Sequence, residues 1–473
     1  MKNILLIHSS RKVLGGEDKL FTKESLVPSL GLASVAAYCA ENGISPRIID
    51  LRLPRYSMRD VLDYIAESKP VLAGITAFTA DIVFANETAR LIKEKYPGLP
   101  VVAGGPHPSL VPGLTLEEFK SFDAVVVGEG ERTLVELVET YGRGAAAEPG
   151  SVAGIAYRKD GKTVLNPARE VIDDIAALPF PAWHLFDLKS YNNIFPVSAS
   201  RGCPYRCYFC TPLYLGGRVR TRGHESIFRE IRYLVDKFNA ARVQFSDAMM
   251  GIENEELSLL CDELSASGLS GRVAWDCETR ADAVDPALLG KMKKAGCRWV
   301  ALGVESGNER ILREVVCKAE TKEQIRKAVA MIKKAGLRVR CFFILGHCTE
   351  TAATIKDTIR FALELRPQAL SFGLMVPNPG SGIRQLAEKG AGGLRIIHSR
   401  WQDYQQFDFS CLESKELPLE ELKRWQSNAY FTYYLHNPLK ALQMLFNGSS
   451  YNYSPGGIIK IVKMLLINKF KRQ

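Results

Sequence analysis

Short apolar runs alternate with amphipathic helical patterns along most of this 473-residue chain, in two successive series. In the first series, the apolar runs cover residues 3–8, 46–51, 71–76, 100–105 and 123–128. Helical patterns separate them, for example over residues 30–42 and 80–95. Short apolar strands between amphipathic helices are typical of parallel sheets with helices on both faces. The first series therefore predicts a doubly wound, Rossmann-like α/β domain.

Small residues follow three of these apolar runs. Ligands of parallel sheets bind at the carboxyl ends of the strands, and residues without bulky side chains let a large ligand approach the backbone. The candidate binding residues are Thr76, Thr79, Gly104, Gly105, His107, Gly128, Glu129, Gly130 and Glu131. Gly-rich loops are equally typical of tight turns, so this pattern alone does not choose between a ligand and a turn.

A polar region, residues 146–195, precedes the second series, and Asp160-Gly161 within it predicts a β-hairpin. The second series has apolar runs at residues 196–200, 242–247, 272–277, 298–306, 338–346 and 369–377. The helical patterns between them include a broken one over residues 307–335. Six consecutive βα units predict an open or partial (β/α)6 barrel, with catalysis at the carboxyl ends of its strands.

Three cysteines, Cys203, Cys207 and Cys210, follow the first strand of the second series with the spacing C-x-x-x-C-x-x-C. A disulfide would leave one thiol over. Structural zinc normally takes four ligands, and the next cysteine is Cys261. A [4Fe-4S] cluster usually takes four thiolates, so three would leave one iron open to an outside ligand. We favour this open cluster over zinc or a purely structural role.

Composition is that of a large globular enzyme, with 46% hydrophobic and 24% charged residues. No uninterrupted apolar run reaches the ~18 residues of a membrane span. The N-terminal MKNILLIHSS has no secretory pattern, and the other cysteines are scattered singly, so we expect a cytoplasmic protein with reduced thiols. The net charge of +10 permits an acidic substrate, nucleic acid or an anionic membrane surface without choosing among them.

Longer stretches of the chain resemble cobalamin-dependent radical S-adenosylmethionine (SAM) enzymes that carry an N-terminal B12-binding domain. The stretch RGCPYRCYFC (201–210) resembles the cluster loop of this family, and WDCETRAD (275–282), MKKAGCRWVALGVESGNERIL (292–312) and PNPGSGIRQLAEKG (377–390) resemble its later barrel motifs. Upstream, VAGGPHPSLVP and DAVVVGEGERTLVEL resemble the loops that flank the corrinoid. The resemblance covers nearly the whole chain.

The resemblance implies four regions and three cofactors. Residues 1–145 would bind cobalamin, residues 146–195 would form a linker, residues 196–385 would form the radical SAM barrel with its [4Fe-4S] cluster, and residues 386–473 would form a small helical region. The cluster would be held by the three cysteines. The residues that match the SAM contacts of the family are Phe209, Arg280, Glu305, Ser306 and Gly346. Glu305-Ser306 is also explained as the cap of a helix that begins at Gly307.

The chain departs from the family pattern in two places. Gly346-His-Cys-Thr-Glu350 stands where the family usually has Gly-x-Pro-Gly-Glu, which puts the adenosine-side backbone contact in doubt. The Asp-x-His-x-x-Gly signature, which supplies a lower cobalt ligand in some B12 domains, is absent from the sequence. We expect no histidine below the cobalt, we interpret His8 as a packed residue, and we assign His107 at most a contact with the corrin.

The resemblance implies reductive cleavage of SAM to an adenosyl radical, followed by cobalamin-dependent methylation of an unactivated carbon in a small molecule, lipids and isoprenoids included. A reductase such as flavodoxin or ferredoxin would supply the electron. Two alternatives stay open: a radical SAM cyclase or ring-rearranging enzyme acting on tetrapyrroles or hopanoid-type lipids, and a non-catalytic corrinoid or cluster sensor. RNA-modifying methylthiotransferases share the cysteine spacing. The sequence has no second cysteine triad and no basic RNA-binding tail domain, so we expect no nucleic-acid partner.

The C-terminal part of the chain is less informative. The stretch LEELKRWQSNAYFTYYLHNPLKALQMLF (419–446) predicts aromatic-rich helices that form either a packing layer or a lid. The last segment, GGIIKIVKMLLINKFKRQ (456–473), is apolar and basic, as in helices that lie on an anionic membrane. Docking onto the body of the protein explains it equally well, so membrane association on the cytosolic face is an expectation only. The sequence does not indicate an oligomeric state.

Overall fold

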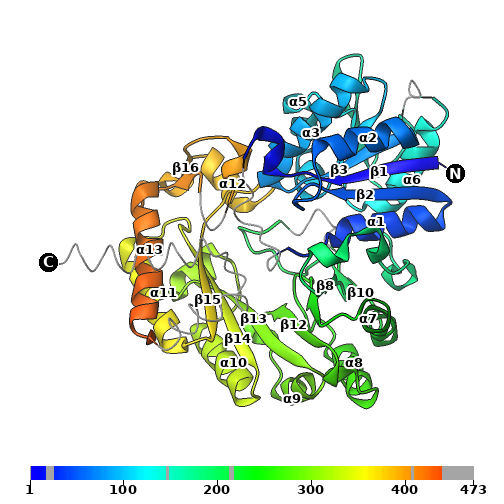
Figure 1. Cartoon of the computed structure of the whole chain (residues 1–473). Helices are drawn as coiled ribbons and strands as arrows, with labels where there is room; N and C mark the ends of the chain where they lie inside the picture. The colour runs from blue at the N-terminus through cyan, green and yellow to red at the C-terminus, as the bar shows by residue number, and fades with distance from the viewer. Residues whose placement is uncertain (1, 17–25, 145–148, 212–217, 406–409, 439–473) are drawn as a thin grey trace. The chain divides into compact units, whose positions relative to one another are not determined.

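The computed structural model describes residues 2–16, 26–144, 149–211, 218–405 and 410–438 (Figure 1). The chain divides into two compact units. The first comprises most of residues 1–192 together with residues 218–220, and the second comprises residues 193–211 and the chain from residue 221 onward.

A seven-stranded sheet forms the centre of the first unit, in the order β2-β1-β3-β4-β5-β6-β7. Its strands are β1 (Lys2–His8), β2 (Ile44–Asp50), β3 (Leu72–Thr76), β4 (Val101–Gly104), β5 (Ala124–Val126), β6 (Ile155–Lys159) and β7 (Lys162–Leu165). The pairings among β1 to β5 are parallel. The strand order reverses direction at β1, because β2 lies on one side of it and β3 on the other. The predicted doubly wound α/β fold is confirmed.

Helices cover both faces of this sheet. They are α1 (Leu30–Glu41), α2 (Met58–Ser68), α3 (Ile82–Lys95), α4 (Pro106–Leu110), α5 (Pro112–Glu118) and α6 (Gly130–Tyr141). Helix α1 packs beside α6 on one face, and α2 packs beside α3 on the other (Figure 1). Strand β1 lies between two neighbours and under both layers, so its residues Ile4, Leu5, Leu6 and Ile7 are all buried. This position explains why β1 is a continuous apolar run rather than an alternating one.

The region expected to link the domains contributes to the first sheet. Strand β6 pairs antiparallel with β5, and β7 pairs antiparallel with β6. Asp160 and Gly161 form the turn between β6 and β7, with φ angles of 50° and 74°, as a two-residue hairpin turn requires. The hairpin predicted at this position is confirmed, and it lies at one edge of the N-terminal sheet.

The second unit contains a six-stranded parallel sheet in the order β15-β14-β13-β12-β11-β8. Its strands are β8 (Ile194–Val197), β11 (Arg242–Phe245), β12 (Ala274–Thr279), β13 (Cys297–Glu305), β14 (Arg338–Leu345) and β15 (Ala369–Leu374). Each strand pairs with the next one in this series, as in an unrolled barrel, and β8 and β15 are its two edges. The α/β class with six consecutive parallel strands is confirmed.

Helices connect these strands: α7 (His224–Phe238), α8 (Asn254–Ala266), α9 (Pro286–Lys294), α10 (Lys322–Lys334) and α11 (Ala352–Leu365). A π-helical turn (Ile311–Val315) precedes α10, so the break predicted within residues 307–335 is present. Helix α10 begins with a capping box, in which Thr321 Oγ1 accepts from Gln324 N and Gln324 Oε1 accepts from Thr321 N. Its buried residues are Ile325, Ala328, Val329 and Ile332, which form a stripe at helical spacing.

The chain after the sixth strand is only partly helical. Helices α12 (Gly382–Glu388) and α13 (Leu419–Leu435) flank an antiparallel pair of short strands, β16 (Arg395–Ile396) and β17 (Leu412–Glu413). Two further short strands are β9 (Ser200–Arg201) and β10 (Arg220–Thr221). The sequence predicted a small helical region here; helices α12 and α13 are present, and the strand pair lies between them, with Arg395 bonded to Glu413 across it. The basic segment 456–473 lies outside the described residues.

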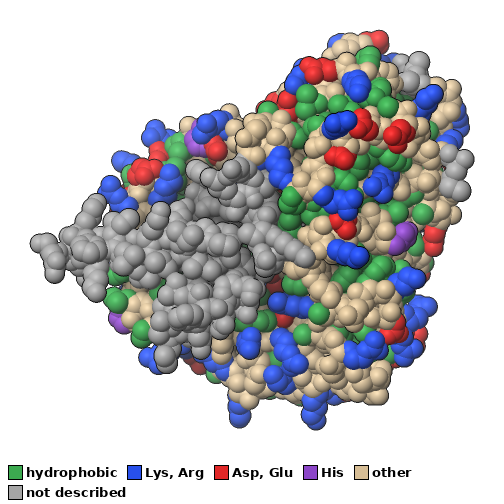
Figure 2. All heavy atoms as spheres, in the orientation of Figure 1, with side chains coloured by type: hydrophobic (Ala, Val, Ile, Leu, Met, Phe, Trp, Pro, Cys, Tyr) green, Lys and Arg blue, Asp and Glu red, His purple; other side chains and the backbone are tan. Residues whose placement is uncertain are grey.

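In Figure 2, Lys and Arg side chains are spread among acidic, apolar and other side chains over the described part of the face drawn. No helix in the described part of the chain is long and apolar enough to cross a membrane.

Candidate cofactor and active site

The three candidate cluster ligands lie on one loop of the second unit, at the carboxyl end of β8 and β9. Cys203 and Cys207 are half-buried and Cys210 is exposed, and all three thiols are free of disulfides. Gly202 begins the loop with a φ of 96°, a conformation that favours glycine. Burial raises the pKa of the Cys207 thiol and raises the pKa of the Cys210 thiol to about 11.

Asp247 fixes the strand that leads into this loop. Its carboxylate follows β11 and accepts hydrogen bonds from Ala199 N at 3.0 Å, from Ser200 Oγ at 2.6 Å and from Ser200 N. Asp247 is 5% exposed. Burial raises the pKa of this carboxyl, although the bonds from Ser200 and Ala199 oppose the rise. The cysteine loop thus begins from a backbone tied to the neighbouring strand.

Tyr208 fixes the other half of the loop, between Cys207 and Cys210. Its N–H donates to Val316 O at 3.4 Å, and its carbonyl accepts from Ile383 N at 3.1 Å. Its hydroxyl accepts from Cys348 N at 3.1 Å. These partners precede α10, begin α12 and follow β14, so one residue joins the cysteine loop to three other segments.

A buried charge cluster lies beside the loop. Lys318 Nζ is 3.4 Å from Glu305 Oε1 and 3.1 Å from Glu320 Oε2, and it also donates to Gly303 O. Arg280 is 3.9 Å from Glu320 Oε1, and its guanidinium lies over the ring of Tyr205 at 3.7 Å. The cluster therefore contains two cations and brings two candidate SAM residues, Arg280 and Glu305, together.

The charge cluster acts on the cysteine loop. Burial raises the pKa of Cys207. Lys318 and Arg280 lower it because they stabilise the thiolate, and Glu305 raises it because it repels the thiolate. Burial disfavours the charged form of Lys318, but Glu305 and Glu320 outweigh it and raise the pKa of this lysine. Burial raises the pKa of Glu305, and Lys318 opposes that rise. Thiolates and a cluster that carries net negative charge are stabilised by such cations.

The type of ligand on this loop, cysteine thiols, fits an iron-sulfur cluster. Three unpaired thiols stand on one accessible loop, next to two buried cations. Within the described ranges, however, no three His, Cys, Asp or Glu side chains converge closely enough to hold a metal ion. The cysteine side chains share a loop without meeting at one point, so binding a cluster requires them to turn toward a common centre.

The structure shows a local role for Ser306. This residue is fully buried, its hydroxyl lies 3.2 Å from Thr358 Oγ1, and it accepts from Asn308 N at 3.2 Å. Ser306 therefore caps the turn that follows β13, which is the alternative the sequence left open for it. Glu305, the last residue of β13, has a φ of 63° and is held by Lys318.

The loop Gly346–Glu350 keeps its shape despite its unusual residues. Glu350 Oε2 accepts from Gly346 N at 2.6 Å and from His347 N at 3.2 Å. Thr349 adopts a φ of 59° at the place of the usual second glycine, and Arg310 donates to its hydroxyl and its carbonyl, both at 2.9 Å. Burial raises the pKa of Glu350 to about 7. A backbone turn is thus present at this strand end although the glycine is absent.

The candidate cobalamin loops of the first unit meet at one edge, because β3, β4 and β5 are parallel neighbours. Gly105 has a φ of 99°, and a Cβ on it would lie 2.9 Å from Thr76 Oγ1. His107 is fully buried, with Nδ1 3.4 Å from Thr79 Oγ1. A Cβ on Gly104 would meet nothing nearer than Val126 Cβ at 3.9 Å. Space for a side chain is thus present at Gly104, which fits the approach of a corrin there, whereas Gly105 is required by the close contact with Thr76 and by its positive φ.

The loop after β5 is less open to a ligand. Gly128 has a φ of 78° and donates its N–H to Ser109 Oγ at 3.0 Å. Glu129 accepts hydrogen bonds from Arg220 Nη1 and from Ile172 N, both at 2.8 Å. Its carboxylate therefore binds two other segments of the first unit. Gly130 is the first residue of α6, and Glu131 is 3% exposed in its first turn.

His8 is packed inside the first unit. It is 5% exposed, and its Nδ1 lies 3.2 Å from Ser9 O. Burial lowers its pKa to about 4. Next to it on the paired strand, Asp50 accepts from Tyr191 Oη at 2.6 Å and forms an ion pair with Arg52 at 2.6 Å. These contacts agree with the interpretation of His8 as a packed residue.

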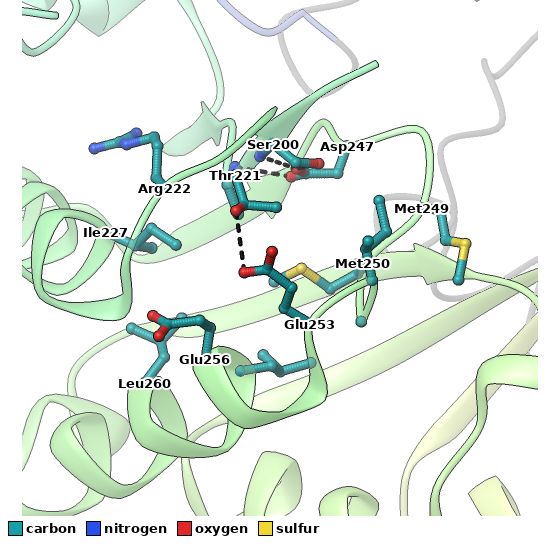
Figure 3. A pocket seen from close by; sticks show the side chains of 14 residues that line it. Ser200, Thr221, Arg222, Ile227, Asp247, Met249, Met250, Glu253, Glu256 and Leu260 are labelled. Atoms are coloured by element: carbon teal, nitrogen blue, oxygen red, sulfur yellow. Dashed lines mark hydrogen bonds between the residues drawn. The ribbon is translucent and has the colours of Figure 1, made fainter. Parts of the chain in front are cut away.

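An open pocket lies beside the start of the cysteine loop (Figure 3). Ser200, Met249 and Met250 line it from the strand ends, and Thr221, Glu253 and Glu256 line it near the helices. Figure 3 shows Thr221 bonded to Glu253, at 3.0 Å, and Ser200 bonded to Asp247. The pocket walls thus include Asp247, which fixes the strand leading into the cysteine loop.

Four residues of this site were not identified in the sequence: Tyr208, Asp247, Lys318 and His347. Tyr208 stands between two proposed ligands, and Asp247 ends an apolar run, so both positions carried a signal. Lys318 and His347 carried none, because their burial depends on packing between segments distant in the chain.

Two family models match the chain in separate places. Residues 20–138 match the B12 binding domain, and residues 197–362 match the Radical SAM superfamily. An uncharacterized methyltransferase of Pyrococcus horikoshii is 30% identical over 413 residues, which are 86% of this chain and 88% of that protein. The anaerobic magnesium-protoporphyrin IX monomethyl ester cyclase of Rubrivivax gelatinosus is 30% identical over 370 residues, 76% of this chain and 66% of that protein.

The fold also has a solved counterpart. The radical S-adenosylmethionine methyltransferase TsrM from Kitasatospora setae superposes with a TM-score of 0.72 over 92% of this chain and 89% of its own chain, at 20% identity. At this identity the likeness concerns the fold alone.

Proposed function

This chain belongs to the B12-dependent radical SAM family, and we propose that within it the protein is a C-methyltransferase that acts on a small molecule. The cofactors of the family are a [4Fe-4S] cluster, SAM and cobalamin. Methyltransferase names among the relatives support the reaction type. The observation that carries the proposal is the loop with three free cysteine thiols, which has two cations beside it. The same chain has a B12-type domain with small residues at the ends of its strands.

Each proposed residue has a role that its position supports. Cys203, Cys207 and Cys210 would bind three irons and leave the fourth for SAM. Arg280 and Lys318 would favour the thiolate form of Cys207. The bound cluster supplies the electron for SAM cleavage, and cobalamin carries a methyl group.

Further residues would bind the other parts of the cofactors. Phe209, Glu305 and Gly346 would line the SAM site, whereas Ser306 would act by shaping the turn after β13. The loops at Thr76–Thr79, Gly104–His107 and Gly128–Glu131 would surround the corrin.

A cyclase is the second candidate. The Rubrivivax gelatinosus cyclase is as similar in identity as the methyltransferase relative, although less of its length is covered. The same residues would serve both reactions, because each begins with SAM cleavage and the outcome depends on what the substrate does next.

The substrate and partners are proposed from sequence alone. The basic, apolar segment 456–473 supports a lipid or isoprenoid substrate reached from the cytosolic face of a membrane. A flavodoxin or ferredoxin would deliver the electron.

Anaerobic reconstitution tests the cluster assignment. The wild-type protein should take up one oxygen-sensitive [4Fe-4S] cluster and produce 5′-deoxyadenosine or S-adenosylhomocysteine from SAM. Ala at Cys203, Cys207 or Cys210 should abolish both, whereas the matched change Cys261→Ala, at a buried cysteine on α8, should spare the cluster. A full iron load in the triple variant would refute the ligand assignment.

A further inference from the structure

Two neighbouring connections of the second unit have the same short sequence pattern. Residues 293–298, KKAGCR, lead from α9 into β13, and residues 333–338, KKAGLR, lead from α10 into β14. The glycine of each copy has a positive φ, 95° at Gly296 and 73° at Gly336, as is common where a helix ends. The copies lie side by side, because a Cβ on Gly336 would be 3.8 Å from Lys293 Cε.

The other helix-to-strand connections of this sheet are also basic. Parallel strands begin at the same edge of a sheet, so the connections into β11, β12, β13, β14 and β15 share one face of the unit. From the last three residues of each helix to the second residue of the next strand, they contain two acidic residues, Asp236 and Glu364, which pair with Arg272 and Arg326. They contain ten cations, which we call the basic face: Lys237, Arg242, Arg272, Lys293, Lys294, Arg298, Lys333, Lys334, Arg338 and Arg366.

Helix dipoles explain only part of this excess of positive charge. The lysines of the basic face stand in the last turns of α7, α9 and α10, where a cation is stabilised by the dipole. Arg272, Arg298 and Arg338 stand beyond the helix ends, where this effect has fallen off, and all three are exposed. In the described part of the chain, Lys294, Arg298 and Lys334 form no ion pair. Their charges therefore remain available to an outside partner.

Helix α13 ends beside the basic face. Gln426 Nε2 donates to Phe372 O at 2.7 Å, and Tyr433 Oη donates to Pro367 O at 2.7 Å. Because Pro367 precedes β15 and Phe372 lies within it, α13 runs toward the start of this strand. Leu435, the last residue of α13, is 57% exposed. An exposed apolar side chain thus lies at the margin of the basic face.

An anionic membrane fits these features better than the alternatives. Proteins that bind single-stranded nucleic acid stack the bases on aromatic side chains, but no Trp, Tyr or Phe is exposed in the described part of the second unit. The segment 456–473 is itself basic, so the basic face repels it rather than binding it. Exposed Lys and Arg side chains near an apolar one are typical of surfaces that bind anionic lipids reversibly.

We propose that the basic face of the second unit binds an anionic membrane surface, with Leu435 at its margin. This inference does not depend on the proposed chemistry. The cysteine loop lies at the opposite ends of the strands, so it is turned away from the bilayer in the bound protein. A lipid substrate would then have to leave the bilayer to reach the loop.

Charge reversal on the basic face tests the proposal in the full-length protein. The variant is Lys294→Glu, Arg298→Glu, Lys334→Glu, and binding is measured by cosedimentation with phosphatidylcholine vesicles that contain phosphatidylserine. At low salt the partition coefficient should fall about tenfold or more, because each cation adds to the attraction. The difference should disappear at high salt, since salt screens exposed charges. Gln at the same three positions removes half as much charge and should give an intermediate loss.

The control variant has the same net charge but leaves the basic face intact. It is Lys69→Glu, Lys120→Glu, Lys162→Glu, at exposed lysines of the first unit, and it should bind vesicles like the wild-type protein. Circular dichroism and thermal unfolding identify the variants that fold, and the Gln variant tests the proposal if the Glu variant does not.

Three results would overturn the inference. The first is wild-type vesicle binding by the folded basic-face variant, because the segment 456–473 would then carry the binding. The second is an equal loss in the basic-face and control variants, because net charge alone would then explain it. The third is tighter binding of the wild-type protein to a double-stranded DNA fragment than to the anionic vesicles, because the face would then fit nucleic acid.

Discussion

The backbone N–H of Cys348 donates to the phenol oxygen of Tyr208 at 3.1 Å. This bond joins the loop after β14 to the loop that carries the three cysteines. The two segments are 140 residues apart in the chain. The placement of Cys207 and Cys210, which flank Tyr208, therefore depends on the loop after β14. In the sheet, β14 lies near the edge opposite to β8.

Tyr208→Phe should loosen the cysteine loop. The variant keeps the ring but leaves Cys348 N without its acceptor, which should cost about 1–3 kcal/mol of stability in this unit. We expect a lower iron content after reconstitution and a broadened electron paramagnetic resonance signal of the reduced cluster. Tyr205→Phe is the matched control in the same loop, because it keeps the ring over which Arg280 lies. Equal iron contents and signals in the two variants would contradict this role for Tyr208.

Lys318→Met should be strongly destabilising. It removes the cation between Glu305 and Glu320, both buried, and breaking a buried ion pair by removing one partner costs about 3–5 kcal/mol. Urea unfolding of the second unit measures the loss. Lys327→Met is the control, because Lys327 is 69% exposed and pairs with Glu323 on the helix surface, where such pairs contribute about 0.3–0.5 kcal/mol. Similar losses of unfolding free energy in both variants would contradict the prediction that the buried ion pairs of Lys318 stabilise the second unit.

Much of the fold follows from local patterns. The apolar runs predicted β1 to β5 and the six parallel strands of the second unit within a few residues, because central strands buried on both faces have continuous apolar stretches. Asp160-Gly161 predicted a hairpin, because both residues tolerate positive φ. The short strands β16 and β17 were missed, since each has only two residues and depends on its partner.

The site was predictable where ligands are adjacent in the chain. The cysteine spacing places three thiols on one loop without any tertiary information. The charge cluster was not predictable, since Lys318 meets Glu305 only because the chain turns back after β13. Ser306 and Glu129 stay predictions as cofactor residues, and the structure adds the bonds of their polar groups to Thr358 and Arg220, which sequence spacing does not reveal.

The first unit should lose stability as the pH falls from about 6.5 to about 4, because of His8. Burial lowers the folded pKa of His8 to about 4, so the unfolded chain binds the proton first and stability falls with pH in this window. The contribution is on the order of 3 kcal/mol. Hydrogen exchange of the β1 and β3 amides at several pH values measures it. The His8→Asn variant lacks this pH-dependent contribution, so the difference in stability between wild type and variant should shrink by that amount as the pH falls toward 4. A difference in stability that does not change with pH would contradict this prediction.

Asp50 should affect the stability of the first unit at a lower pH than His8 does. Burial opposes its ionisation, but Arg52 holds the pKa of Asp50 at about 2, so its contribution is lost only as the pH falls below about 4. The two windows are separate, which allows the effect of His8 to be read alone above pH 4.5.

Deleting residues 456–473 should weaken binding to anionic liposomes and spare SAM cleavage. The segment has five Lys or Arg residues, each contributing about 1 kcal/mol near an anionic surface. Cosedimentation at low and high salt measures the effect, with neutral liposomes as the control. If the full chain does not bind liposomes and the truncated chain unfolds, the segment is a packed terminal element instead.

Methyl-deuterated SAM tests the central claim, cobalamin-dependent methylation of carbon, most directly. The reconstituted holoenzyme is incubated with reductant, labelled SAM and a lipid or metabolite extract, and products are compared by mass spectrometry with those of the Cys203→Ala, Cys207→Ala, Cys210→Ala triple variant. We expect a product that carries three deuterium atoms on a new carbon-bound methyl group, formed only by the wild-type protein with cobalamin present. A rearranged or cyclised product without deuterium would contradict it in favour of the cyclase.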